Sequence, residues 1–106
     1  MAVKEGDFVK VDYTGRLEDG TIFDSSIEEV AKKSKYYEEN RNYEPLGFTV
    51  GQGDLIPGFE DGVKGMSEGE KKEVEIPPEE GYGKKGDHPL AGKTLIFEIE
   101  VKEIHS

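Results

Sequence analysis

The chain has 106 residues and a formal charge of −10, from 24 acidic against 14 basic side chains. This length predicts one domain with a single core, and the acidity disfavours nucleic acid, whose phosphates bind clustered cations. No cysteine is present, which excludes disulfides and thiolate metal sites and suits a reducing compartment. The sequence shows no signal-peptide core and no apolar run of membrane-spanning length. We therefore expect a soluble cytoplasmic protein that does not bind membranes.

Two short strands joined by a turn are predicted near the start of the chain. Apolar and polar residues alternate over 9–13 (VKVDY), which is the period of a strand with one buried face. Turn-forming residues follow at 17–20 (LEDG), and 21–23 (TIF) form a second apolar run. This order predicts a β-hairpin.

Residues 27–40 (IEEVAKKSKYYEEN) predict a polar helix within the segment 27–44. Ile27, Val30 and Ala31 would share one face of it. Two Glu–Lys pairs at i,i+4 spacing would support its exposed side.

A short apolar helix is predicted at 56–66 (IPGFEDGVKGM). Pro57 suits the first helical position. Steps of three and four place four side chains on one face: Ile56, Phe59, Val63 and Met66. Gly62 and Gly65 would each weaken the helix by about 1 kcal/mol relative to alanine, so we expect tertiary packing to hold it.

Two further strands are predicted in the second half of the chain. The alternation over 95–102 (LIFEIEVK) is the strongest strand signal in the sequence, and 71–76 (KKEVEI) repeats it. No repeat or linker divides residues 1–106. Strands gathered around one or two short helices predict a single α+β domain with a mainly antiparallel sheet.

The sequence gives little support to metal or nucleotide chemistry. Neither His88 nor His105 has a second ligand at helical spacing, and the glycines form no phosphate-binding pattern. We therefore expect no metal and no cofactor. What remains is a set of apolar and aromatic residues, whose simplest interpretation is a core without further function: Tyr13, Phe23, Phe48, Ile56, Phe59, Tyr82 and Phe97.

Three stretches resemble the FKBP-type peptidyl-prolyl cis-trans isomerases: VDYTGRLEDGTIFDSS at 11–26, FTVGQGDLIPGFEDGVKGMSEGEKKEVEIPPEEGYG at 48–83 and HPLAGKTLIFEIEV at 88–101. They occur in the family's order and cover nearly the whole chain apart from 27–44. The resemblance implies an antiparallel sheet curled around a short helix. A pocket of aromatic and aliphatic side chains between them would receive proline.

The resemblance also implies the site residues. Asp24, Tyr82 and Tyr13 would be the catalytic set. The substrate-binding set would be Phe23, Leu46, Phe48, Leu55, Ile56, Phe59, Leu90, Phe97 and His88. Leu46 replaces a second aromatic found in many members, and Phe59 replaces the tryptophan common in animal members. For the arginine that pairs with the pocket aspartate in several members, Arg41 is an unaligned candidate.

The implied roles have structural alternatives. The Asp24 carboxylate would stabilise the twisted amide from the rim of the pocket and accept a hydrogen bond from Tyr13, or it would cap the segment that follows it. The Tyr82 hydroxyl and the Ile56 N–H would donate hydrogen bonds to the substrate backbone, or Tyr82 would only cover the edge of the core. His88 would contact the peptide or be a surface histidine.

Within the family the chain is most similar to the archaeal and bacterial SlyD-like branch, whose members usually carry a chaperone domain inserted after the G-Y-G motif. Here only four residues separate Gly83 from His88, so that domain is absent. The expected partners are proline-containing peptides, unfolded protein chains and macrolide inhibitors, and we expect a monomer. The alternatives are a non-catalytic proline-peptide binder or chaperone, and an acidic scaffold.

Overall fold

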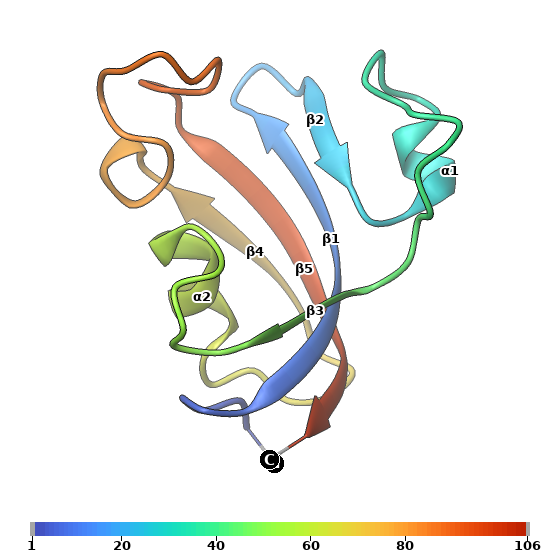
Figure 1. The fold of residues 1–106 in the computed structure, drawn as a ribbon, viewed down its shortest axis with the longest axis vertical. Coiled ribbons are helices and arrows are strands. Elements are labelled where there is room, and N and C mark those ends of the chain that lie inside the picture. Colours follow the sequence, from blue (N-terminus) through green and yellow to red (C-terminus); the bar gives the residue numbers. More distant parts are fainter. Residues whose placement is uncertain (1, 106) are drawn as a thin grey trace.

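The alternating segment near the start of the chain lies in the longest pair of strands in the sheet. The structure, a computed structural model, describes residues 2–105. In it β1 (Phe8–Leu17) pairs along its length with β5 (Leu95–His105). The five-stranded sheet has the order β2-β1-β5-β4, with β3 also paired to β1, and every pairing is antiparallel. The fold is α+β, as the sequence predicts (Figure 1).

The inward face of this ladder is apolar because the side chains of a strand alternate between its two faces. Val9, Val11 and Tyr13 are buried on β1, while the intervening Lys10 is exposed. Leu95, Phe97, Ile99 and Val101 are buried in the same way on β5. The sequence therefore predicts the core face of both strands correctly.

The predicted hairpin joins β1 to β2 (Ile22–Ser25). Gly20 adopts a φ of +92°, which favours glycine, and its N–H donates to the Leu17 carbonyl oxygen at 2.9 Å. The Asp19 carboxylate accepts a hydrogen bond of 2.9 Å from the Thr21 N–H. The turn places Phe23 and Asp24 on the strand beside Tyr13 and Gly15.

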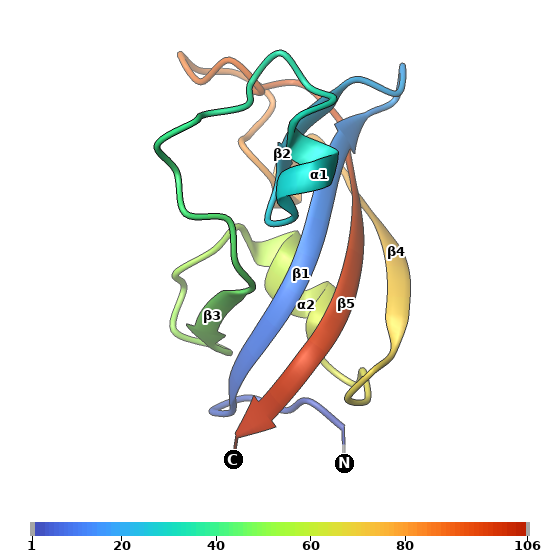
Figure 2. The same ribbon diagram turned by 90° about the vertical axis from the view of Figure 1, so that its right-hand side faces the viewer.

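Helix α2 (Pro57–Val63) lies against one face of the sheet (Figures 1 and 2). Pro57 occupies its first turn, as predicted, and Phe59, Val63 and the nearby Met66 are buried. Gly65 lies beyond the helix, with a φ of +87°. Gly62 lies inside the helix, where a Cβ atom would come within 2.8 Å of a Val74 methyl group on β4 (Lys71–Ile76). The glycine therefore permits the helix to approach the sheet closely.

The predicted polar helix is present but much shorter than expected. Helix α1 spans only Glu28–Ala31, and irregular structure continues to β3 (Leu46–Thr49), a strand that the alternation did not predict. Ser34 helps to end the helix, because its Oγ accepts from the Tyr36 N–H at 3.0 Å and donates to the Ile22 carbonyl oxygen at 3.0 Å. The segment 32–45 therefore folds against β2 and not as a helix.

A short 3₁₀ helix, η1 (Pro78–Glu80), follows β4, and an irregular loop over 81–94 returns the chain to β5. In Figure 1 this loop, drawn in orange, reaches the same end of the sheet as the segment 32–45. Among residues 2–105 no helix is both long and apolar enough to span a bilayer.

Candidate active site

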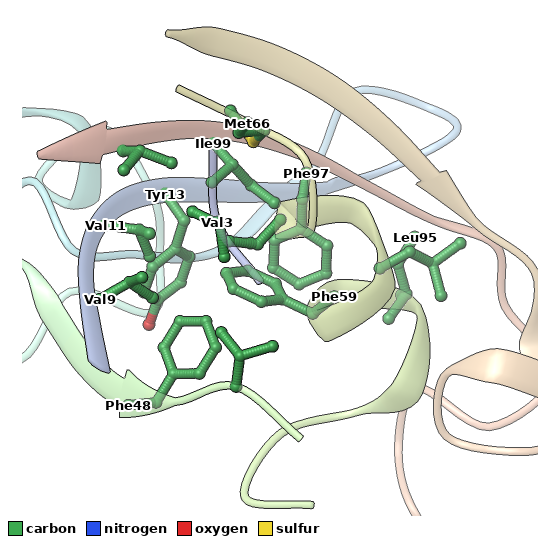
Figure 3. Close-up of a cluster of buried hydrophobic side chains, with 14 residues drawn as sticks. Val3, Val9, Val11, Tyr13, Phe48, Phe59, Met66, Leu95, Phe97 and Ile99 are labelled. Carbon is green, nitrogen blue, oxygen red and sulfur yellow. The ribbon is translucent and has the colours of Figure 1, made fainter. Parts of the chain in front are cut away.

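Four aromatic rings pack together between β1, β3, β5 and α2, and they point toward one another in Figure 3. Phe59 is at the centre and makes three edge-to-face contacts, with its ring centroid 5.1 Å from that of Phe97, 5.8 Å from that of Tyr13 and 6.0 Å from that of Phe48. Such edge contacts are favoured because the positive edge of one ring meets the negative face of the next. The four rings are almost fully buried and form an apolar floor.

Phe23 extends this floor to the outside. Its ring meets the Phe97 ring edge-on, with centroids 5.5 Å apart and an interplanar angle of 87°. The pair closes over the backbone of β1 at Gly15, where an added Cβ atom would lie 2.6 Å from Phe23 Cζ and 2.8 Å from Phe97 Cε1. The missing side chain of Gly15 therefore lets the two rings meet.

Asp24, next to Phe23, carries the charge at the edge of the floor. Its Oδ2 accepts a hydrogen bond of 2.8 Å from the Tyr13 hydroxyl. Its Oδ1 accepts from the Ser25 N–H and from Arg41 Nη1, both at 2.8 Å. Asp24 does not cap α1, because the N-cap residue of that helix is Ile27, whose N–H donates to Ser25 Oγ. The carboxylate is fixed from three sides.

This network shifts the ionisation of its members. Burial, and next the adjacent Asp24 carboxylate, raise the pKa of Tyr13 to about 12. Burial lowers the pKa of Arg41, but the hydrogen bonds to Asp24 and Tyr13 outweigh it and raise that pKa above its ordinary value. At neutral pH the site therefore holds a protonated phenol and a charged guanidinium.

Arg41 lies in the irregular segment after α1, and its guanidinium reaches the β1–β2 hairpin. Besides its contact with Asp24, its Nη2 donates to the Tyr13 hydroxyl oxygen at 3.3 Å. The Arg41 and Asp24 side chains are 35% and 36% exposed. An ion pair at that exposure stabilises a fold by about 0.2–1 kcal/mol, whereas immobilising an arginine costs up to about 2 kcal/mol of entropy. The ion pair alone therefore does not account for the order of Arg41.

The loop over 81–94 contributes further residues to the site. The Tyr82 ring stacks on the His88 ring, with centroids 3.9 Å apart and an interplanar angle of 5°. His88 Nδ1 accepts a hydrogen bond of 3.0 Å from the Leu90 N–H. Burial, with a smaller contribution from Asp24, raises the pKa of Tyr82. His88 is thus exposed but placed between two pocket residues, Tyr82 and Leu90.

The sequence that forms the floor, the carboxylate and the loop matches a family of known proteins. The family described as FKBP-type peptidyl-prolyl cis-trans isomerase matches residues 1–102. The chain belongs to this family. Relatives within the FKBP-type family include the short-type peptidyl-prolyl cis-trans isomerase of Methanocaldococcus jannaschii, with 56% identity over 97 residues. They also include peptidyl-prolyl cis-trans isomerase FKBP2 of Mus musculus (41% over 103 residues) and FK506-binding protein 1A of Aspergillus fumigatus (43% over 105).

The matches cover 92%, 95% and 97% of this chain in that order. They cover 57% of the archaeal protein, 64% of the mouse protein and 82% of the fungal protein. The chain therefore spans less than two thirds of the first two relatives.

The residues predicted for an FKBP-type site fall into two groups. Tyr13, Phe48, Phe59 and Phe97 form the buried floor. The others are half-buried against it, except for the exposed His88: Phe23, Asp24, Leu46, Leu55, Ile56, Tyr82 and Leu90. Except for Asp24 and His88, the predicted residues thus belong to one apolar cluster or pack against it.

A groove of about 340 Å³ extends the site beyond Asp24. Its lining includes Phe23, Asp24, Tyr82, His88 and Leu90 from the predicted set, and also Tyr36, Glu38, Arg41 and Tyr43 from the segment 32–45. Of these four, sequence reasoning singled out only Arg41, because the segment has no counterpart in the family motifs. Three tyrosines and an arginine within eight residues, 36–43, were the available signal. Residues 2–105 contain no cluster of three or more metal-ligand side chains.

Proposed function

We propose that this chain is a peptidyl-prolyl cis-trans isomerase that accelerates rotation about X-Pro bonds in peptides and unfolded chains. The observation that carries the proposal is the Asp24 carboxylate, which Tyr13 and Arg41 hold at the edge of an aromatic floor. Family membership supports the same reaction. The archaeal and mouse relatives carry this reaction in their names.

The reaction needs no nucleophile. Amide resonance creates a rotational barrier of about 18–20 kcal/mol, while the cis and trans forms of an X-Pro bond differ by only about 0.5–1 kcal/mol. A catalyst must therefore bind the twisted amide more tightly than the planar one, and each 1.36 kcal/mol of that preference gives about a tenfold acceleration. An apolar site helps, because the charge-separated resonance form of the planar amide is less stable away from water.

The residues divide the work. The aromatic floor takes the proline ring. The Asp24 carboxylate faces the rotating carbonyl group and stabilises the twisted state electrostatically. The Tyr82 hydroxyl and the Ile56 N–H, which donates to no acceptor within residues 2–105, orient the substrate backbone.

The test is cis-to-trans exchange of an X-Pro tetrapeptide, followed by NMR. The parent protein is expected to accelerate the exchange, and Asp24→Asn and Tyr82→Phe are each expected to reduce that acceleration. Asp61→Asn is the matched control, because Asp61 is an exposed residue of α2 that pairs with Lys64. Exchange at the uncatalysed rate with the parent would overturn the proposal. Peptide-induced shifts of pocket resonances without acceleration would identify a proline-peptide binder instead.

A chaperone role is the second candidate. We propose a SlyD-like isomerase without the inserted flap domain, since four residues between Gly83 and His88 leave no room for it. Large exposed apolar side chains within 2–105 are limited to Phe8, Ile27 and Tyr36. Short peptides should therefore be isomerised well and proline-limited refolding of whole proteins poorly, and equal efficiency on both would contradict this. Cytoplasmic location, a monomeric state and macrolide binding stay predictions.

A further inference from the structure

Tyrosine rings of the segment 32–45 stack beside the Arg41 guanidinium. The Arg41 Cζ atom lies 4.8 Å from the centroid of the Tyr43 ring, within the range of a cation–π contact. The Tyr43 ring in turn stacks on the Tyr37 ring, with centroids 5.6 Å apart and an interplanar angle of 11°. One continuous stack therefore leads from Tyr37 to Arg41.

The hydroxyl groups of both rings fix the stack to the fold. Tyr37 donates a hydrogen bond of 3.2 Å to Glu28 Oε2 on α1. The Tyr43 hydroxyl oxygen accepts a hydrogen bond of 3.0 Å from the Glu38 N–H. The rings are thus tied to α1 at one end and to their own loop in the middle, while Arg41 lies at the far end.

Arg41 has few other restraints within residues 2–105: its N–H donates a hydrogen bond of 3.2 Å to the Glu38 carbonyl oxygen, and its guanidinium bonds to Asp24 and to the Tyr13 hydroxyl. Arg41 lies in a segment without regular secondary structure, and both side chains of its pair with Asp24 are more than one third exposed. A planar ring restricts the guanidinium to one plane, which an exposed ion pair does not.

We propose that Tyr43 is a positioning residue of the active site. It acts through Arg41, which its ring holds in contact with Asp24 and the Tyr13 hydroxyl. Tyr37 supports Tyr43 from α1. The catalytic consequence rests on the proposed isomerase function, whereas the ordering of Arg41 does not.

The first test compares two variants of Tyr43. Tyr43→Leu removes the ring plane but keeps apolar bulk, and Tyr43→Phe keeps the ring and removes only the hydroxyl. Tyr43→Leu is expected to lower kcat/KM on an X-Pro peptide roughly two- to fivefold, while Tyr43→Phe, which keeps the ring and loses only the bond from the Glu38 N–H, is expected to lose less. An equal loss in both variants would overturn the role of the ring. If Tyr43→Leu does not fold, Tyr37→Leu replaces it, with a smaller loss expected.

The second test reads the order of Arg41 by NMR without any reaction. The chain has only two arginines, and Arg16, which pairs with Glu73 at 2.9 Å on the surface, is a reference in the same spectrum. Relaxation of the guanidinium ¹⁵N signals is expected to show Arg41 becoming mobile in Tyr43→Leu while Arg16 does not change. An Arg41 signal equal to that of the parent would overturn the proposal.

A double-mutant cycle shows whether Tyr43 acts through Arg41. In an Arg41→Leu background, Tyr43→Leu should cause no further loss of kcat/KM, because its target is already gone. A loss of the same size in both backgrounds would mean that Tyr43 does not act through Arg41, and would overturn the proposal. If the parent does not catalyse exchange at all, the isomerase function fails, and the relaxation measurement still decides whether Tyr43 orders Arg41.

Discussion

The Tyr13 hydroxyl on β1 donates a hydrogen bond of 2.8 Å to Asp24 Oδ2 on β2. The two residues are neighbours across a hairpin whose register places Thr14 opposite Ser25 and Gly15 opposite Asp24. A buried ring of the floor therefore also orients the carboxylate at its edge. The Tyr13 side chain therefore contributes both to the packing of the floor and to the position of the Asp24 charge.

Tyr13→Phe tests that connection. The variant keeps the ring in the floor but leaves Asp24 with its contacts to Ser25 and Arg41 only. A hydrogen bond to a charged group contributes about 1.5–3 kcal/mol, and the remaining contacts compensate for part of it, so we expect kcat/KM to fall by roughly three- to tenfold. Peptide exchange by NMR measures this. Unchanged kcat/KM in a folded variant would show that catalysis does not depend on the orientation of the Asp24 carboxylate by the Tyr13 hydroxyl.

Alkaline stability should depend on the same phenol. Burial and the Asp24 carboxylate raise the pKa of Tyr13 to about 12, whereas tyrosine in an unfolded chain titrates near pH 10. A folded-state pKa above the unfolded one gives stability that is fully present below about pH 10 and is lost as the pH rises through about 12. This stabilisation is on the order of 2 kcal/mol, and about half of it should be lost at pH 11.

Urea unfolding at pH 8 and pH 11 measures this loss. The free energy of unfolding should fall more between the two pH values in the parent than in Tyr13→Phe. Only the parent has the Tyr13 hydroxyl, whose pKa is raised in the folded state. All other ionisable groups are present in both proteins, so their contributions cancel in the comparison. Equal losses would contradict the assignment.

The close approach of α2 to β4 predicts an unusual response to alanine. Alanine normally stabilises a helix by about 1 kcal/mol relative to glycine, but at Gly62 its Cβ would lie 2.8 Å and 2.9 Å from the two Val74 methyl groups. We therefore expect Gly62→Ala to lower the free energy of unfolding by about 1–3 kcal/mol. Adding Val74→Ala should recover part of that loss relative to the sum of the single changes. A more stable Gly62→Ala protein in urea unfolding would refute the close approach.

The stack of Tyr82 on His88 predicts two different effects of substitution at position 88. His88→Phe keeps the stacked ring and loses only the acceptor for the Leu90 N–H. His88→Ala loses both and should weaken peptide binding about threefold or more, since a stacked pair contributes about 0.5–1.5 kcal/mol. NMR titration with an X-Pro peptide measures both affinities. An alanine variant that binds as well as the phenylalanine variant would show that the stack does not support binding.

The strands other than β3, and helix α2, were predictable because their apolar period is local. The alternation over 9–13 and 95–102 indicates the buried faces directly, and the sheet fixes them in register. The polar helix at 27–40 was predicted too long, since its end depends on contacts made elsewhere. Glu28 accepts a hydrogen bond from Tyr37, and Ser34 bonds to Ile22 on β2.

The site was predictable only in part, and for a similar reason. The motifs around Tyr13, Asp24 and Tyr82 imply the family pocket, but the partner of Asp24 comes from a segment with no counterpart in those motifs. Arg41 and Asp24 are 17 residues apart in the chain, and no periodicity relates them. Tyr36 and Tyr43 also line the groove from this irregular segment. The position of the segment is set by tertiary contacts and not by a local pattern in the sequence.

Gly15 has a consequence for the shape of the proposed site. A residue that contributes no side-chain atom sets how closely Phe23 and Phe97 meet. A single methyl group at position 15 would displace the two rings, because its carbon would lie within 3 Å of both. The distance between two aromatic rings of the proposed site can therefore be changed from the backbone of β1, while both ring side chains stay the same.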